Sequence, residues 1–559
     1  MNVVIVGGYG VFGSRLAELL VRDGWCVWIA GRNLSAAEAC ATRLGARALR
    51  VDRDGDLAPI LDAAPQVVVD AAGPFQAYGA DGYRLVRFCL ERGISYLDLA
   101  DDAGFAAGVT ALDAASRAAG RFAISGASSA PGLSSAVAAA LIEGLDTVAS
   151  IDIAIAPGNR APRGRSVIAA ILSQVGAPLR LWRGGAWREA RCWSERRLLT
   201  LGPRDWRSVR TLGAPDLALF PERFAARSVT FRAGLELGVL NLALSALSVL
   251  RRCGVALHGP RFVAFAQTVA NVLEPLGSDR GAMSVEVVGM RRGEPYVQTW
   301  TLVAEAGEGP FVPAVVVRAV LRQIDRIAPG ARPCVAEITL EEAEDAMSDL
   351  AVATTRHEQP RPTLFQTALG DAWRDLPASV RRLHSVQDVE SFSGRASVER
   401  GRGLLARLAA WVFGFPEAGE DVAITVTVTC TPRGELWVRD FAGRAFKSHL
   451  TASGPSRFRE RFWAFVYELG LPIEGGALSF QMRRGWFLGA PVPKPLLPRS
   501  DTREFERDGR FHFDVALSAP LGAGLIVRYR GWLLPDADQK TAADDEPAPA
   551  SIASARAQR

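Results

Sequence analysis

The chain begins with Asn2-Val3-Val4-Ile5-Val6-Gly7-Gly8-Tyr9-Gly10-Val11-Phe12-Gly13, an apolar run that ends in a cluster of glycines. Residues 14–22 then carry apolar side chains at helical spacing, so the pattern predicts a buried strand, a tight turn and a helix. A second apolar run at 26–30 follows at the distance expected of a βαβ unit. The segment therefore predicts an α/β fold with a doubly wound parallel sheet.

Three of these glycines, in the pattern Gly8-x-Gly10-x-x-Gly13, have the spacing of a dinucleotide-binding turn. The first permits the tight turn, the second admits a pyrophosphate, and the third lets the helix pack closely on the strand. The helix N-terminus then faces the negative charge. We therefore predict cofactor contacts from the run Gly8, Tyr9, Gly10, Val11, Phe12 and Gly13; the alternative is a turn needed only for packing.

The end of the second strand indicates which dinucleotide is bound. An NAD site would place an acidic residue here, but this chain has Gly31-Arg32-Asn33. An arginine suits a ribose 2′-phosphate and stacks on adenine, so the sequence favours NADP, held in part by Arg32 and Asn33. The alternative is that Arg32 is an ordinary surface residue.

Composition limits the class of protein. A chain of 559 residues predicts three or four domains, and a net charge of +5 without a dense basic run argues against a nucleic-acid partner. The first lysine is Lys447, so the preceding residues supply no Schiff-base or phosphate-binding lysine. Seven scattered cysteines without Cys/His clusters predict neither disulfides nor a metal site. With a strand starting at residue 2, we expect a cytoplasmic protein without a signal peptide.

Residues 233–250 form an apolar segment of about the minimum length for a membrane span. It carries Glu236 and Asn241, which favours a buried or interface helix over membrane contact. Peripheral contact with the inner face of a membrane or with lipid, and association into a homodimer, are both left open.

The order of elements predicts four regions. Strands and helices alternate over residues 1–135, as in a dinucleotide-binding domain. Residues 136–353 predict a mixed α/β domain with paired strands at 283–290 and 296–304. A linker is expected at 354–363, a β-rich α+β domain at 364–535, and a disordered Ala/Asp/Pro-rich tail at 536–559.

Several motifs together resemble the saccharopine dehydrogenase-like NADP-binding proteins. They are the opening glycine turn, Ala30-Gly31-Arg32-Asn33, Asp70-Ala71-Ala72-Gly73-Pro74-Phe75 and Cys89-x-x-x-Gly93-x-x-Tyr96-x-Asp98. The resemblance covers residues 1–135, and more loosely the family's substrate and dimerisation domain at 136–353. It implies oxidation or reduction of C–N bonds, or of C=C bonds as in some relatives. Residues 364–535 resemble an uncharacterised domain fused behind such reductases.

One departure from the family concerns the substrate. Asp101-Asp102 stands where many relatives have Gly-Glu, which argues against an amino-acid substrate.

Two further groups of residues are candidates for the chemistry. Ala72, Gly73 and Pro74 follow the fourth strand of the parallel sheet, where a small-residue turn suits the approach of the nicotinamide. Tyr96, Asp98 and Asp102 end the next strand, and two neighbouring carboxylates could raise one pKa enough for proton transfer. In the alternative, Asp98 caps the following helix, and Asp101 and Asp102 are solvated.

The sequence thus predicts an NADP(H)-dependent oxidoreductase that acts on a C=N, C=C or C=O bond of a small-molecule substrate. The rival hypothesis is a non-catalytic dinucleotide-sensing protein whose C-terminal domain binds a lipophilic ligand or a partner. Alternating strands such as 424–430 and 511–517 would then enclose an apolar pocket instead of closing a core.

Overall fold

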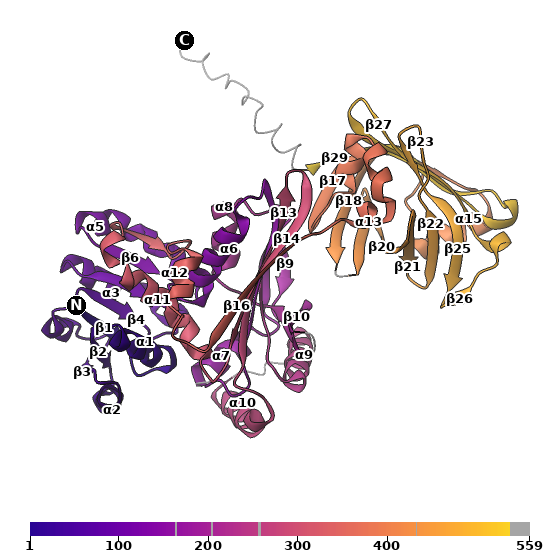
Figure 1. Cartoon of the computed structure of the whole chain (residues 1–559). Coiled ribbons are helices and arrows are strands. Elements are labelled where there is room, and N and C mark those ends of the chain that lie inside the picture. Colours follow the sequence, from indigo (N-terminus) through magenta and orange to yellow (C-terminus); the bar gives the residue numbers. More distant parts are fainter. Residues whose placement is uncertain (163–164, 203–204, 255–258, 432, 537–559) are drawn as a thin grey trace, which may run out of the picture. The chain divides into compact units, whose positions relative to one another are not determined.

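The computed structural model describes residues 1–162, 165–202, 205–254, 259–431 and 433–536. The chain folds into two compact units, Met1–Pro360 and Arg361–Arg559, shown in Figure 1. The predicted border near residue 135 falls inside the first unit and stays a prediction. The tail predicted for 536–559 lies, apart from Asp536, outside the described residues.

A seven-stranded parallel sheet opens the first unit, in the order β15-β6-β5-β4-β1-β2-β3. Its strands are β1 (Asn2–Val6), β2 (Cys26–Gly31), β3 (Arg47–Arg50), β4 (Val67–Asp70), β5 (Ser95–Asp98), β6 (Phe122–Ser125) and β15 (Gly330–Pro333). This confirms the predicted doubly wound sheet. The strand β15 was not predicted, because it comes some 200 residues after its neighbour β6.

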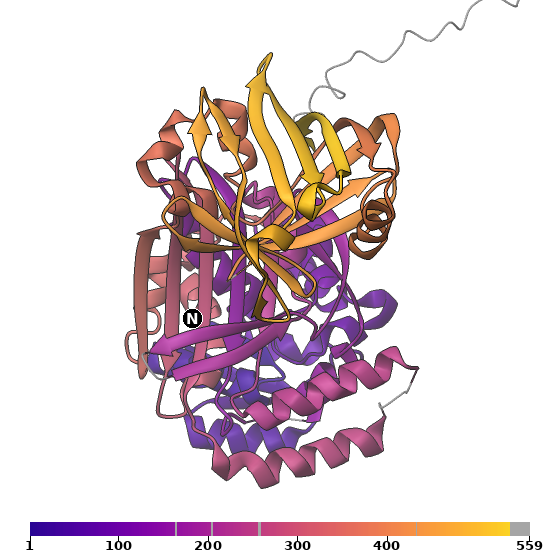
Figure 2. The same ribbon diagram turned by 90° about the vertical axis from the view of Figure 1, so that its right-hand side faces the viewer.

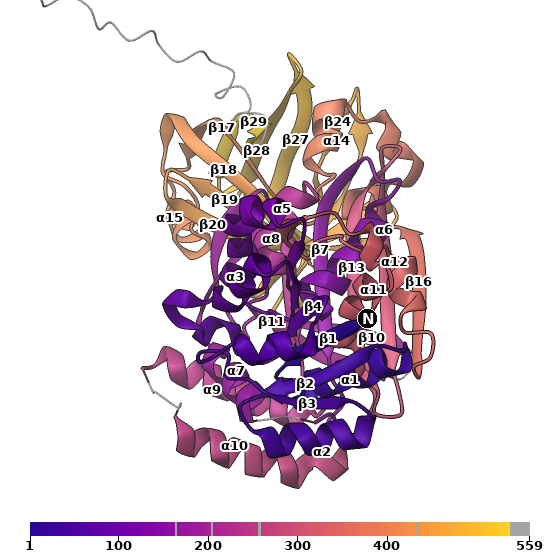
Figure 3. The same ribbon diagram turned by 90° about the vertical axis from the view of Figure 1, so that its left-hand side faces the viewer.

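Helices cover both faces of this sheet (Figure 3). They are α1 (Val11–Arg22), α2 (Leu34–Leu44), α3 (Arg84–Glu91), α4 (Ala103–Gly108), α5 (Asp113–Ala118), α6 (Ser134–Ile142), α11 (Val312–Arg322) and α12 (Leu340–Asp345). In β1, Val3 and Ile5 pack in the same cluster as residues of α1 and α11, whereas Val4 and Val6 pack with residues of α3. Burial on both faces explains why the strands are continuously apolar.

The rest of the first unit contains a nine-stranded mixed sheet. It comprises β7 (Thr147–Ala156), β8 (Pro178–Arg183), β9 (Ala186–Arg191), β10 (Arg196–Gly202), β11 (Asp205–Thr211), β12 (Val229–Ala233), β13 (Gly281–Arg291), β14 (Glu294–Ala304) and β16 (Val352–Pro360). The predicted hairpin is confirmed, since β13 pairs antiparallel with β14. The predicted linker is wrong over residues 354–360, because β16 pairs with β14 along its whole length.

Four helices accompany this sheet, namely α7 (Arg165–Gln174), α8 (Asp216–Arg223), α9 (Gly238–Arg252) and α10 (Pro260–Leu273). Figure 2 shows α9 and α10 as adjacent helices at the edge of the first unit. Residues of α7, α9 and α10 share a small apolar cluster around Leu172 and Leu247.

The second unit is built on a thirteen-stranded antiparallel sheet, in the order β23-β24-β27-β28-β29-β17-β18-β19-β20-β21-β22-β25-β26. The strands are β17 (Val389–Arg400), β18 (Gly419–Thr431), β19 (Gly434–Phe441), β20 (Arg444–Gly454), β21 (Arg457–Phe462), β22 (Phe465–Gly470), β23 (Ile473–Glu474), β24 (Ala477–Ser479), β25 (Gln481–Phe487), β26 (Ala490–Pro491), β27 (Arg499–Arg507), β28 (Arg510–Ser518) and β29 (Leu525–Pro535). With α13 (Leu364–Leu369), α14 (Ala378–Leu383) and α15 (Leu404–Phe413), they confirm the predicted β-rich α+β class.

Candidate dinucleotide site

The glycine turn after β1 is held by close backbone contacts. Gly7 has φ +76°, and a Cβ there would lie 2.6 Å from the Cα of Ala72. The N–H of Gly10 donates to the carbonyl of Gly7 at 2.9 Å, and a Cβ on Gly13 would overlap that carbonyl. Gly7 therefore belongs to the turn as firmly as the three glycines of the predicted spacing. The sequence could have indicated this role, because Gly7 directly precedes the three glycines of that spacing.

The N-terminus of α1 lies in this turn. Gly10 is the N-cap residue, and no side chain caps the helix there. Val11 is half-buried and Phe12 is 37% exposed, so the first turn of the helix is accessible from outside. Because the leading N–H groups of a helix attract anions, this end of α1 fits a pyrophosphate.

Tyr9 joins the turn to the end of β2. A Cβ on Gly31 would overlap the ring of Tyr9, and the Tyr9 hydroxyl accepts a hydrogen bond from the N–H of Asn33 at 3.3 Å. The Asn33 side chain accepts a hydrogen bond from the N–H of Ala36 at 3.1 Å and so caps α2. The structure thus gives Asn33 a capping role, and its contact with a cofactor stays a prediction.

Two guanidinium groups lie at this edge of the sheet. Arg32 follows β2, and Arg50 ends β3 opposite Gly31. Both side chains are exposed, and neither has an ion-pair partner in the part of the chain that the structure describes. The pair could bind one phosphate from two sides. Arg50 was missed because its strand partner cannot be read from local sequence.

The loop after β4 is fixed by a buried carboxylate. Asp70 is 0% exposed, and its Oδ2 accepts a hydrogen bond from Arg53 Nε at 2.9 Å. Its Oδ1 accepts hydrogen bonds from the Tyr78 hydroxyl at 3.1 Å and from the N–H of Ala72 at 3.0 Å. Asp70 therefore holds Ala72, Gly73 and Pro74 beside the glycine turn, with Ala72 and Pro74 exposed.

Asp98 ties together the ends of β5 and β6. Its Oδ1 accepts hydrogen bonds from Ala100 N–H at 3.0 Å, Ser125 Oγ at 2.9 Å and Gly126 N–H at 2.7 Å. Its Oδ2 is buried and has no partner among the described residues. Burial raises the pKa of Asp98 to about 7, and the negative charge of Asp70 adds to this, although the three hydrogen bonds act to lower the pKa.

The other two predicted catalytic residues lie in different surroundings. Tyr96 is 0% exposed and packs among apolar residues beneath α3, and burial raises the pKa of its hydroxyl well above the ordinary value. Asp102 is half-buried and caps α4, accepting a hydrogen bond from the N–H of Phe105 at 2.8 Å. The capping role that the alternative gave to Asp98 thus belongs to Asp102. Tyr96 is thus enclosed in the core and Asp102 has a capping role, and a part for either in catalysis stays a prediction.

Polar side chains without a partner follow β6. Ser128 and Ser129 are half-buried, and their hydroxyls form no hydrogen bond within the described residues. At Gly126 this loop lies close to the loop after β5, since a Cβ added to Gly126 would lie 3.5 Å from the carbonyl oxygen of Ala100. The loops after β1, β4, β5 and β6 therefore meet at the carboxyl edge of the sheet, where doubly wound folds bind ligands.

The apolar segment 233–250 is divided between the end of β12, a loop and α9. Buried Asn241 accepts a hydrogen bond from the N–H of Leu235, and Glu236 accepts one from the Ser278 hydroxyl at 2.7 Å. Among the described helices, none combines the length and the apolar character needed to cross a membrane. Four large apolar side chains of α9 are exposed nonetheless, namely Val239, Leu242, Val249 and Leu250. Contact of this surface with lipid or a second subunit stays a prediction.

Comparison with known proteins places two families along the chain. Residues 3–124 match the saccharopine dehydrogenase NADP binding domain, and residues 376–533 match a domain of unknown function, DUF4166. No curated protein matches the chain significantly. The chain thus carries a saccharopine dehydrogenase-type dinucleotide-binding domain followed by a DUF4166 domain, as the motifs predicted.

Solved structures similar to the chain include several dehydrogenases. Saccharopine dehydrogenase (L-Glu forming) from Saccharomyces cerevisiae is 16% identical with a TM-score of 0.46, and the match covers 64% of this chain and 99% of that one. A probable dehydrogenase from Thermotoga maritima is 10% identical with a TM-score of 0.32, covering 63% and 98% of the two chains.

Proposed function

We propose that the first unit is an NADP(H)-dependent oxidoreductase that transfers a hydride to or from a C=N, C=C or C=O bond of a small molecule. The observation that carries this proposal is the uncapped N-terminus of α1 inside the glycine turn, at the same sheet edge as the unpaired Arg32 and Arg50. One end of this edge suits a pyrophosphate and the other a ribose phosphate. The match to an NADP-binding family over residues 3–124 supports the same cofactor.

When bound, the dinucleotide supplies or accepts the hydride. The protein therefore has to bind the cofactor and the substrate, orient them and exclude water. The glycine turn holds the pyrophosphate, and Arg32 and Arg50 hold the 2′-phosphate. Ala72, Gly73 and Pro74 border the nicotinamide side, in the position that Asp70 fixes. Ser128 and Ser129 offer hydroxyls to a polar substrate atom.

Asp98 is a positioning residue in this proposal. It connects the loops after β5 and β6, which we expect to border the substrate. Tyr96 and Asp102 take no part in it, since one is enclosed in the core and the other caps a helix.

The test is NADPH oxidation by the full chain with a panel of imines, conjugated enones and ketones, and the reverse reaction with NADP⁺. We expect turnover with one class of compound, and its loss in Gly10→Val. A protein that binds NADPH tightly but turns over none of these classes would favour the rival hypothesis of a dinucleotide sensor.

A further inference from the structure

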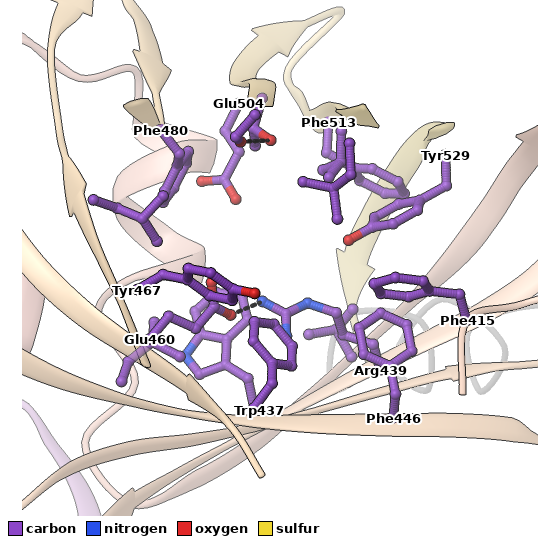
Figure 4. A pocket seen from close by; sticks show the side chains of 18 of the residues that line it. Phe415, Trp437, Arg439, Phe446, Glu460, Tyr467, Phe480, Glu504, Phe513 and Tyr529 are labelled. Carbon is purple, nitrogen blue, oxygen red and sulfur yellow. Dashed lines mark hydrogen bonds and ion pairs between the residues drawn. The ribbon is translucent and has the colours of Figure 1, made fainter. Parts of the chain in front are cut away.

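The second unit contains an apolar chamber on the inner face of its curled sheet (Figure 4). Its volume is about 140 Å³, and nine of its lining residues are phenylalanines. A dry cavity of roughly 150 Å³ is known to accept a benzene-sized molecule. The chamber therefore has room for one ring or a short branched chain, and its walls favour an apolar occupant.

The charged groups inside the chamber already have hydrogen-bond partners. Arg439 lies 3.4 Å from Glu460 and donates a hydrogen bond to Ser448 Oγ at 2.9 Å. Glu504 is hydrogen bonded to His384, with 2.6 Å between Oε2 and Nε2. An anionic group entering the chamber would find its one arginine, Arg439, already paired, and burying such a group would be costly.

Two hydroxyls in the chamber remain available. Tyr467 and Tyr529 line the wall, and within the described residues their hydroxyls have no hydrogen-bond partner. Burial raises the pKa of each to about 12, so both stay neutral donors. Because these hydroxyls are neutral, they add no charge to the chamber, which therefore suits an uncharged group.

The chamber adjoins a wide hollow between β25 and β27, two strands that lie close together without pairing. Phe480, Met482, Pro498, Ser500 and Thr502 line both spaces. The hollow has a volume of about 1060 Å³ and is lined by five basic and three acidic side chains.

Three of those basic side chains are uncommitted. Within the part of the chain described, Lys494, Arg499 and Arg503 are exposed and form neither an ion pair nor a side-chain hydrogen bond. By contrast, Arg483 donates to Gln481 Oε1 at 2.9 Å, and Arg528 is paired with Asp514 at 2.6 Å. Unlike the chamber, the hollow therefore offers spare positive charge to an anion.

We propose that the chamber and the hollow together bind a small amphiphile with a phosphate-type anionic head group. Its uncharged ring or short chain enters the chamber between β25 and β27, and its head group stays in the hollow near Arg499 and Arg503. The reverse orientation would bring the anionic head group beside Glu460 and Glu504, with Arg439 already paired, and is therefore excluded. This site is independent of the dinucleotide site of the first unit.

Calorimetric titration of the full chain with hexyl phosphate, hexanol and inorganic phosphate tests the proposal. We expect hexyl phosphate to bind at least about tenfold more tightly than either fragment, because it makes both sets of contacts. Binding no tighter than that of inorganic phosphate, or than that of hexanol, would overturn the proposal, as would the absence of binding. Binding only to vesicles that contain phosphatidic acid would overturn it too, since it would indicate a membrane surface.

Two kinds of variant locate the site. The double variant Arg499→Glu/Arg503→Glu should weaken hexyl phosphate at least about tenfold and leave hexanol unchanged. The matched control is Arg507→Glu, an exposed arginine of the same strand that does not line the hollow.

Val515→Trp should abolish binding of both alkyl compounds by filling the chamber. If this variant does not fold, Ser500→Phe makes the same test at the opening. Unchanged hexyl phosphate binding in a folded variant of either kind would contradict the assignment.

Discussion

The guanidinium of Arg318, in α11, forms a two-point ion pair with Asp23, the residue that ends α1, at 2.9 and 2.7 Å. The two residues are 295 positions apart, and the Arg318 side chain is only 3% exposed. Arg318 also donates to the carbonyl of Ala346 at 2.8 Å and to Asp349. This arginine therefore holds the returning chain segment against the first helix of the dinucleotide-binding domain.

Replacing Arg318 with methionine should destabilise the first unit by about 3–5 kcal/mol, because two carboxylates would lose a buried partner. Burial alone would raise the pKa of Asp23, but hydrogen bonds and charge from Arg318 and Arg322 lower it to about 2. A carboxylate whose pKa is lowered by folding stabilises the folded state at pH values above its ordinary pKa. This contribution is lost as the pH falls through the pKa of the folded state. Urea denaturation at neutral and acidic pH should therefore show the largest difference at neutral pH.

Arg322→Met is the matched control, one turn further along α11. Arg322 also contacts Asp23, at 3.1 Å, but its side chain is 32% exposed. We expect a loss of about 1 kcal/mol or less, as for other solvent-accessible pairs. Equal losses in the two variants would show that burial of the pair is not what matters.

Substitution of Gly10 by valine should abolish NADPH binding without unfolding the chain. A Cβ there meets only the carbonyl of Gly7, at 3.1 Å, so the added side chain fits the fold but occupies the approach of the pyrophosphate. Calorimetric titration should show at least about a tenfold weaker affinity, or 1.4 kcal/mol. Gly238→Val is the control, since Gly238 also begins a helix and has open space around it. Normal affinity in Gly10→Val would remove the cofactor from this turn.

Arg32→Asp should reverse the preference of the protein for NADPH over NADH. The change removes a charge-assisted contact of about 1.5–3 kcal/mol and adds a carboxylate that can bond ribose hydroxyls. Arg43→Asp, at the other end of α2, controls for the change in net charge. If the unmodified protein binds both dinucleotides equally, neither Arg32 nor Arg50 contacts the phosphate.

Local patterns predicted the features that local geometry decides. The glycine cluster, the helix of residues 11–22 and the alternation of Ile424, Val426 and Val428, all buried in β18, follow from short-range spacing. The place of Tyr96 could not be predicted, because β5 is buried on both faces and its pattern does not tell which face carries the tyrosine. The strand β15 and the pairing of Arg50 with Gly31 depend on partners distant in sequence.

The last prediction concerns pH and rests on Asp98 and Asp216, both 0% exposed. Burial raises the pKa of each from an ordinary value of 3.8 to about 7. A carboxyl whose pKa is raised by folding contributes stability at low pH, and that contribution is lost as the pH rises through the folded pKa. The unmodified chain should therefore lose this contribution as the pH rises, whereas Asp98→Asn should not. The unfolding free energy of the variant, relative to that of the unmodified chain, should be about 2 kcal/mol higher at pH 8 than at about pH 5.5. Asp216→Asn should behave alike, whereas Asp62→Asn, at an exposed position, should change nothing. Urea denaturation of the four proteins at both pH values measures these differences, and a parallel pH dependence in all four would mean that neither buried carboxyl titrates in this range.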